Sequence, residues 1–201
     1  MARSTRRDFD LTMDELRVVA DYVVRHAEDV LSVFEEAAPD DPRPRAAIGA
    51  ARAFVNGANR TTWQRVASVE AHRAARSAPS EAARLAARSA GDAASAAYLH
   101  PIAKVSQVGH ILRACASVAR IGEIAAGGDP GIADALLERS RQRATPVLID
   151  VLRRYPPVTN GGNRVAQLMC TLDRSLRQAA DRSPGTPAPS RAGARRTERT
   201  S

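Results

Sequence analysis

The sequence predicts an all-α protein, a single-domain bundle of about eight helices followed by a disordered basic C-terminal tail. Three observations point to this fold class: alanine and arginine dominate the composition, aromatic residues make up only 3%, and β-branched residues are few. Alanine and arginine favour helices, whereas sheets draw on β-branched and aromatic residues. At 201 residues the chain is also long enough for one domain with a substantial core.

The first helix is predicted to begin at about Met13, within the T-x-x-E pattern of Thr12 and Glu15. These two residues can form a capping box, in which each side chain bonds the backbone amide of the other. The apolar residues that follow keep a spacing of three and four, which places them on one face that needs partner helices: Leu16, Val19, Val23, Ala27, Val30, Leu31 and Phe34. The sequence APDDPRPR ends this helix.

Three more helices are predicted before residue 100. Asp41 and Pro42 suit the N-cap and first position of the second helix, because proline there loses no needed donor. This helix ends ahead of Gly57, at the position where glycine commonly follows a helix. After a threonine cap, the third helix is expected over about 63–77, and the alanine-rich fourth helix over about 80–99.

Pro101 interrupts the helical pattern, because its ring clashes with the preceding turn and disfavours helical geometry at the residue before it. A fifth helix is predicted from Pro101 to about residue 126. Shorter helices follow over about 131–143 and 146–154, and the last helix covers about 163–180. The chain therefore divides into a flexible N-terminus, a helical domain and a disordered Arg/Pro-rich tail: residues 1–10, 11–181 and 182–201.

The tail carries much of the positive charge. Residues 182–201 account for +4 of the formal net charge of +8, and residues 11–181 hold only +3. The tail lacks large apolar residues and cannot bury enough surface to offset its ordering entropy, so it is either a solvated tail or a basic interaction arm. Because a duplex-binding surface needs its positive charge gathered on one face, nucleic acid is a disfavoured partner.

Targeting and cofactor motifs are missing from the sequence. There is no apolar signal region and no run of about 18 apolar residues, so we expect a cytoplasmic protein with no membrane partner. No P-loop, dinucleotide-binding glycine motif, H-E-x-x-H or nucleophile elbow occurs. Cys115 and Cys170 lie in apolar helical patterns, which predicts buried reduced thiols. We predict no cofactor and no metal site.

The stretch AAYLHPIAKVSQVGHIL is the richest in reactive side chains and contains the only lysine. If the chain bends sharply at its proline, four residues could converge as a candidate catalytic group: Asp92, Tyr98, His100 and Lys104. A carboxylate beside a lysine or histidine can tune a proton-transfer pair, and a desolvated lysine can act as a nucleophile. The structural alternative is an ion pair between Asp92 and Lys104, with His100 as a cap.

Four further residues are candidate ligand-binding positions: Trp63, His72, Gln107 and His110. Helical spacing places Gln107 on a polar face with His110 to one side, and such a face is more often simply the solvated side. Trp63 is interpreted mainly as a core residue, and His72 as a donor of a buried structural hydrogen bond.

Several motifs resemble one known family. AAYLHPIAKVSQVGHILRACASVARIGE, together with RPRAAIGAARAF, WQRVASVEAHRAAR, VLRRYPP and LMCTLDRSL, is similar to the Imm-5-like putative immunity proteins of bacterial toxin systems. The resemblance covers about residues 11–178, and A-Y-L-H-P with Q-V-x-H-I-L is its most specific part. It implies an all-helical cytoplasmic protein whose partner is a cognate toxin, and it brings no catalytic residues. The basic extension and Asp92 depart from the pattern.

Two hypotheses about function follow, from different classes. The first is an immunity protein that binds and neutralises a cognate bacterial toxin. The second is a helical-scaffold enzyme of small-molecule (specialised-metabolite) biosynthesis, with acid/base or amine–carbonyl condensation chemistry in an interhelical pocket. There Asp92 would be the acid or base, Tyr98 and His100 would assist, and Lys104 would supply a charge or form an imine. A nucleic-acid accessory role rests on the arginines alone and ranks last.

Overall fold

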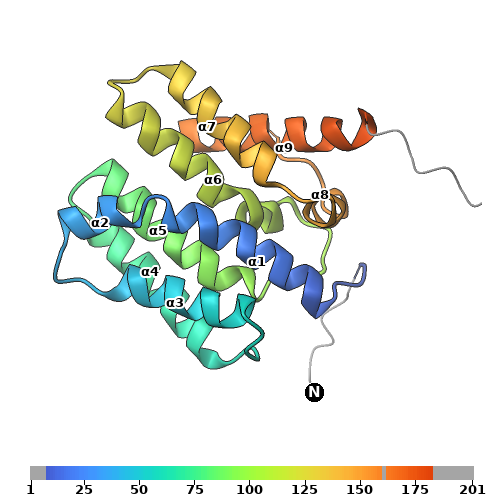
Figure 1. The fold of residues 1–201 in the computed structure, drawn as a ribbon, viewed down its shortest axis with the longest axis horizontal. Helices are drawn as coiled ribbons and strands as arrows, with labels where there is room; N and C mark the ends of the chain where they lie inside the picture. The colour runs from blue at the N-terminus through green and yellow to red at the C-terminus, as the bar shows by residue number, and fades with distance from the viewer. Residues whose placement is uncertain (1–7, 160–161, 183–201) are drawn as a thin grey trace, which may run out of the picture.

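The computed structural model describes residues 8–159 and 162–182, and in these ranges it contains nine helices and no strand (Figure 1). The predicted all-α class is therefore confirmed. Most of the predicted tail and of the predicted flexible N-terminus lies outside the described residues. The helices are α1 (Met13–Glu28), α2 (Leu31–Ala37), α3 (Arg43–Val55), α4 (Thr62–Ser77), α5 (Glu81–Ala96), α6 (Val105–Ala125), α7 (Pro130–Arg143), α8 (Pro146–Arg153) and α9 (Arg164–Arg182).

One predicted helix is two helices in the structure. The capping box at Thr12 and Glu15 is present, with the Glu15 amide 3.2 Å from Thr12 Oγ1 and the Thr12 amide 2.7 Å from Glu15 Oε2. The helix that it starts ends at Glu28 instead of continuing past Phe34. Asp29 lies at the break and forms an ion pair with Arg143 at the end of α7. A contact between distant segments thus accompanies the turn that separates α1 from α2.

Helix α5 is the central element of the bundle. It packs against α1, α2, α3, α4 and α6, and most of its sixteen residues are buried. Small side chains make this possible, because alanine and glycine allow neighbouring helices to approach closely. Helix α6 is the second centre and packs against α1, α5, α7 and α9. In Figure 1, α3 and α4 lie on one side of the α5–α6 pair, and α7 and α9 lie on the other.

The link between α5 and α6 is longer than the sequence predicted. The fifth predicted helix does not begin at Pro101; α6 begins at Val105. His100 explains part of the difference, because its backbone groups bond two side chains and the Ile102 amide and do not take part in a helical hydrogen-bond pattern. Its amide donates to Gln107 Oε1 at 3.0 Å, and its carbonyl accepts from the Tyr155 hydroxyl at 3.0 Å. These two bonds hold the corner of the chain.

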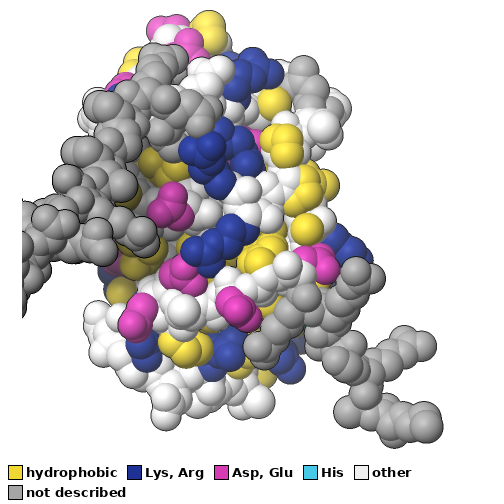
Figure 2. Space-filling model, turned by 90° about the vertical axis from the view of Figure 1, so that its right-hand side faces the viewer, with side chains coloured by type: hydrophobic (Ala, Val, Ile, Leu, Met, Phe, Trp, Pro, Cys, Tyr) yellow, Lys and Arg dark blue, Asp and Glu magenta, His cyan; other side chains and the backbone are white. Residues whose placement is uncertain are grey.

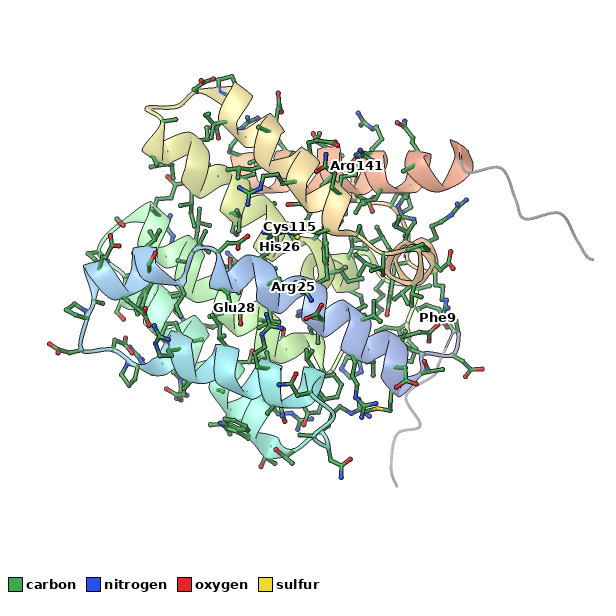
Figure 3. The ribbon with its side chains drawn as sticks, viewed as in Figure 1. Phe9, Arg25, His26, Glu28, Cys115 and Arg141 are labelled. Atoms are coloured by element: carbon green, nitrogen blue, oxygen red, sulfur yellow. The ribbon has the colours of Figure 1, made fainter. Side chains whose placement is uncertain are left out.

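Both ring nitrogens of the buried His26 have hydrogen-bond partners in the interior. His26 lies on α1 where that helix faces α6, near Cys115 in the view of Figure 3. Its Nδ1 donates to the Tyr22 carbonyl at 2.7 Å, and its Nε2 lies 3.0 Å from Ser140 Oγ. Both cysteines of the chain are free and buried, which confirms the prediction of buried reduced thiols.

The described surface mixes charges of both signs. On the face shown in Figure 2, positive and negative side chains lie next to one another with apolar side chains between them. Many arginines are in ion pairs, including Arg45 with Glu35 at 2.6 Å. Within the described ranges, no helix is long and apolar enough to cross a membrane.

Candidate functional site

Asp92, one of the four predicted catalytic residues, is the centre of a buried polar cluster. It lies on α5 with 0% of its surface exposed, and Arg113 of α6 binds both of its carboxylate oxygens. The distances are 2.7 Å from Arg113 Nε to Oδ2 and 2.6 Å from Nη2 to Oδ1. The ion pair expected between Asp92 and Lys104 is therefore wrong. Lys104 precedes α6 at an exposed position, while Arg113 lies two turns inside the helix that packs on α5.

Two histidines stand near this ion pair. His72 of α4 places Nε2 3.7 Å from Asp92 Oδ1, and His110 of α6 places Nδ1 3.1 Å from Ser95 Oγ. Burial lowers the pKa of both histidines, although the Asp92 carboxylate partly opposes this effect. Both imidazoles are accordingly neutral at pH 7. The structure thus brings together three of the predicted residues: Asp92, His72 and His110.

A groove with a positively charged lining opens beside the cluster. One part of it, about 360 Å³, reaches His72, Ala75 and Arg76 on α4. The other part, about 350 Å³, reaches Ser117 on α6 and the first turn of α9. The two parts share three lining residues, which are Arg84 and Arg88 of α5 and Arg113 of α6.

Sequence reasoning missed the arginines of this groove. Arg84 and Arg88 are four residues apart, as are Arg113 and Ser117, so each pair lies on one face of its helix. This spacing could not identify the groove by itself, because arginine is so common in this chain that such pairs are expected. The contact between α5 and α6 also brings the two faces together only in the folded protein.

Tyr98 lies in a different neighbourhood from Asp92. Its hydroxyl donates to the Thr61 carbonyl at 2.5 Å, and its ring lies beneath the guanidinium groups of Arg60 and Arg65 at 5.6 and 4.8 Å. This contact ties the end of α5 to the start of α4. The cation–π geometry is typical of a structural arrangement at a partly exposed site.

His100, Lys104 and Gln107 belong to the link between α5 and α6. His100 bonds through its backbone, and its partners are the side chains of Gln107 and Tyr155 and the amide of Ile102. Within the described ranges, no hydrogen bond or ion pair of the Lys104 side chain is found. The four candidate catalytic residues thus make separate contacts, and the enzyme hypothesis stays a prediction.

Trp63 is an exposed residue, so its interpretation as core is wrong. Half of its surface reaches solvent (50%), because it lies on the side of α4 that faces away from α3 and α5. Val66 and Val69 follow at intervals of three residues and are 57% and 44% exposed. We call these three side chains the α4 strip.

The chemistry that this geometry supports is binding. The Asp92 carboxylate is held by the guanidinium of Arg113 in a two-point contact that joins α5 to α6. The groove offers cations to an anion, and the α4 strip offers apolar surface to a partner. Within residues 8–159 and 162–182, no three His, Cys, Asp or Glu side chains gather as a metal-ligand set.

Comparison with known proteins finds one family model that matches part of the chain. The model of the family described as "Imm-5 like putative immunity protein" matches residues 10–105, which is just under half of the chain. The matched segment includes A-Y-L-H-P and ends before Q-V-x-H-I-L. No curated protein and no solved structure matches the chain. Residues 10–105 of this chain are therefore similar to the Imm-5 like putative immunity protein family.

Proposed function

We propose that this protein is an immunity protein that binds a cognate bacterial toxin in the cytoplasm and neutralises it. The observation that carries the proposal is the family match over residues 10–105, whose family is described by an immunity role. All of α4 lies within this matched segment, and so does the α4 strip.

The α4 strip has the properties of a protein-binding surface, and we assign it to the toxin. Exposed large apolar side chains on one helix are costly to leave in water, and clusters of them commonly mark interaction sites. Trp63 is the type of residue that most often dominates binding energy, because it buries a large rigid area at little entropic cost. The strip thus offers one aromatic anchor and two valines.

Charged residues beside the strip would give the contact its specificity. Arg65 lies next to Val66, and Arg73 and Glu70 form an ion pair at 2.5 Å one turn further along α4. Such exposed charges contribute little to stability but can steer a partner and fix its register. We expect the toxin to present an apolar pocket with charged residues around its rim.

The first test is a protection experiment in bacteria. The toxin to use is the product of a toxin gene adjacent to the gene for this protein, expressed from an inducible promoter. We expect cells to grow when the full chain is co-expressed and to die when it is absent. Cell death in the presence of well-expressed full chain would overturn the proposal.

The second test asks whether the α4 strip makes the contact. Val66→Ser and Val147→Ser are matched variants, because each removes an exposed valine from a helix surface (57% and 43% exposed, on α4 and α8). We expect Val66→Ser and Trp63→Ala to weaken toxin binding in calorimetry, while Val147→Ser binds like the wild type. Equal affinities for all three variants and the wild type would remove the α4 strip from the interface.

A further inference from the structure

The groove over α6 contains more positive charge than its own acids neutralise. Arg113 is paired with Asp92, but Arg84 and Arg88 form no hydrogen bond or ion pair with any residue in the described ranges. They lie one turn apart on α5 and line the same groove as Arg113. Partial desolvation and the neighbouring Arg113 lower the pKa of Arg88, so an anion bound there would relieve a repulsion.

The other acids beside the groove already have partners. Glu81 lines it, and its Oε1 accepts from Arg120 Nε at 3.0 Å. Glu123 is almost completely buried and forms ion pairs with Arg120 and Arg164. The distance from Arg164 Nη2 to Glu123 Oε1 is 2.8 Å. These ion pairs join α5, α6 and the first turn of α9. They neutralise Arg120 and Arg164. Arg84 and Arg88 have no ion pair among the described residues, and Glu81 and Asp92 act on them only from a longer distance.

An independent observation concerns Ser117, one turn after Arg113 on α6. Ser117 is 0% exposed and lines the groove, yet its Oγ has no hydrogen-bond partner among the described residues. A helical serine usually satisfies its hydroxyl on the carbonyl four residues earlier, and a buried hydroxyl without a partner is costly. Its position makes it a donor that is ready for an acceptor oxygen in the groove.

The same groove also has an apolar part. Leu85 of α5 and Val165 and Met169 of α9 line it together with the arginines, and its volume is about 350 Å³. This size is in the range of small-molecule sites, which combine apolar walls with a few polar groups that fix orientation. The lining therefore suits a ligand with an anionic end and a small apolar end.

We propose that this groove binds a small molecule through a phosphate group, held by Arg84, Arg88 and Ser117. A phosphate dianion matches the two guanidinium groups in charge. Its tetrahedral oxygens can accept hydrogen bonds from Arg84 and Arg88 of α5 and from Ser117 of α6 at the same time. A carboxylate has one charge and a planar pair of oxygens, so it would use fewer of these donors. Leu85, Val165 and Met169 would contact the organic part of the ligand.

The test is calorimetric titration of the full chain with three probes at constant ionic strength. Inorganic phosphate, phenyl phosphate and acetate separate phosphate recognition from recognition of any anion. We expect saturable binding of phosphate and weaker binding of acetate. Tighter binding of phenyl phosphate identifies a phosphate monoester as the ligand class, and equal affinities identify free phosphate. Absence of saturable binding of both phosphate probes would overturn the proposal.

Variants locate the site. Arg84→Ala/Arg88→Ala should weaken phosphate binding about tenfold or more, the effect of losing at least one charge-assisted hydrogen bond. Arg139→Ala/Arg174→Ala is the matched control, because it removes the same charge from exposed positions on α7 and α9 that do not line this groove. If both double variants lost the same phosphate affinity, the loss would come from the lower net charge of the protein. That result would contradict the proposed site.

Ser117→Ala separates a binding role from a structural role. Because Ser117 Oγ has no partner in the described protein, removing it should leave the melting temperature of the free protein unchanged or higher. Phosphate binding should nevertheless weaken by about threefold or more. Unchanged phosphate affinity would remove Ser117 from the site. These measurements use no toxin, so their failure is distinguishable from failure of the immunity proposal.

Discussion

Arg113 binds the fully buried Asp92 with two parallel hydrogen bonds, of 2.7 and 2.6 Å, across the contact between α5 and α6. This ion pair joins the two central helices of the bundle. Water does not reach the buried Asp92 carboxylate, so its oxygens depend on a hydrogen-bond partner with fixed geometry. The planar guanidinium of Arg113 is such a partner. The first prediction tests how much of the stability depends on this pair.

Asp92→Asn keeps the shape of the side chain and removes its charge, which leaves Arg113 partly buried without a counter-charge. We expect the free energy of unfolding to fall by roughly 3 kcal/mol. This value is near the lower end of the cost of breaking a buried ion pair, because the Arg113 side chain is 25% exposed and water can partly solvate its charge. Urea unfolding measures this. Asp14→Asn is the control, since Asp14 is 92% exposed in its ion pair with Arg17 and should matter little. Equal effects would contradict a central role for the pair.

His26 predicts how stability depends on pH. Burial lowers its pKa from 6.5 to about 4 in the folded protein. The unfolded chain therefore binds a proton at a higher pH than the folded one, so stability is complete above about pH 6.5 and is lost as the pH falls toward 4. Between pH 7 and pH 5, the wild type should lose about 2 kcal/mol more than His26→Gln. Parallel pH profiles for the two proteins would show that His26 is not responsible.

Two helical glycines predict opposite effects of the same substitution. A Cβ on Gly122 of α6 would lie 2.3 Å from Leu136 Cδ1 of α7, whereas a Cβ on the exposed Gly49 of α3 would meet nothing within 4 Å. Gly122→Ala should destabilise the protein by about 1–3 kcal/mol through overpacking. Gly49→Ala should stabilise it by about 0.5–1 kcal/mol through helix propensity. Thermal unfolding of both variants gives the comparison, and the same sign for both would contradict the close approach of α6 and α7.

The chain corner at His100 gives a fourth prediction. The Tyr155 hydroxyl donates to the His100 carbonyl at 3.0 Å, and Tyr155 is only 2% exposed. Tyr155→Phe removes this bond alone and should cost about 1 kcal/mol of unfolding free energy. Tyr98→Phe is the comparison, because its hydroxyl bonds the Thr61 carbonyl at an exposed position and water can replace it. A larger loss in Tyr98→Phe than in Tyr155→Phe would contradict the assigned role of Tyr155.

Local signals in the sequence predicted the helices well. The capping box at Thr12 and the caps at Ser80 and Thr145 depend on residues within one turn of each other, and all three are present. The break at Asp29 could not be predicted in this way. The apolar spacing continues through it from α1 into α2, and the ion pair at the break involves Arg143, more than one hundred residues later.

The candidate site shows the same division. The sequence singled out Asp92 as a candidate catalytic residue and His72 and His110 as candidate ligand-binding positions, and the structure brings these three together. It did not predict Arg113 as the partner of Asp92 or the exposed position of Trp63. Both depend on how far each helix is rotated about its own axis and on which neighbour covers each face.

The sequence by itself determined the helical class, the positions of most helix ends and the family resemblance of residues 10–105, because composition, caps and motifs are local properties of the chain. Only the tertiary structure decided which charges are paired and which surfaces stay open. Arg84 and Arg88 have no ion pair among the described residues, because packing of α5, α6 and α9 assigned the neighbouring acids to other arginines. In the same part of the protein, packing left the Ser117 hydroxyl without a hydrogen-bond partner. That assignment depends on distances between segments far apart in the sequence, so it exists only in the folded protein.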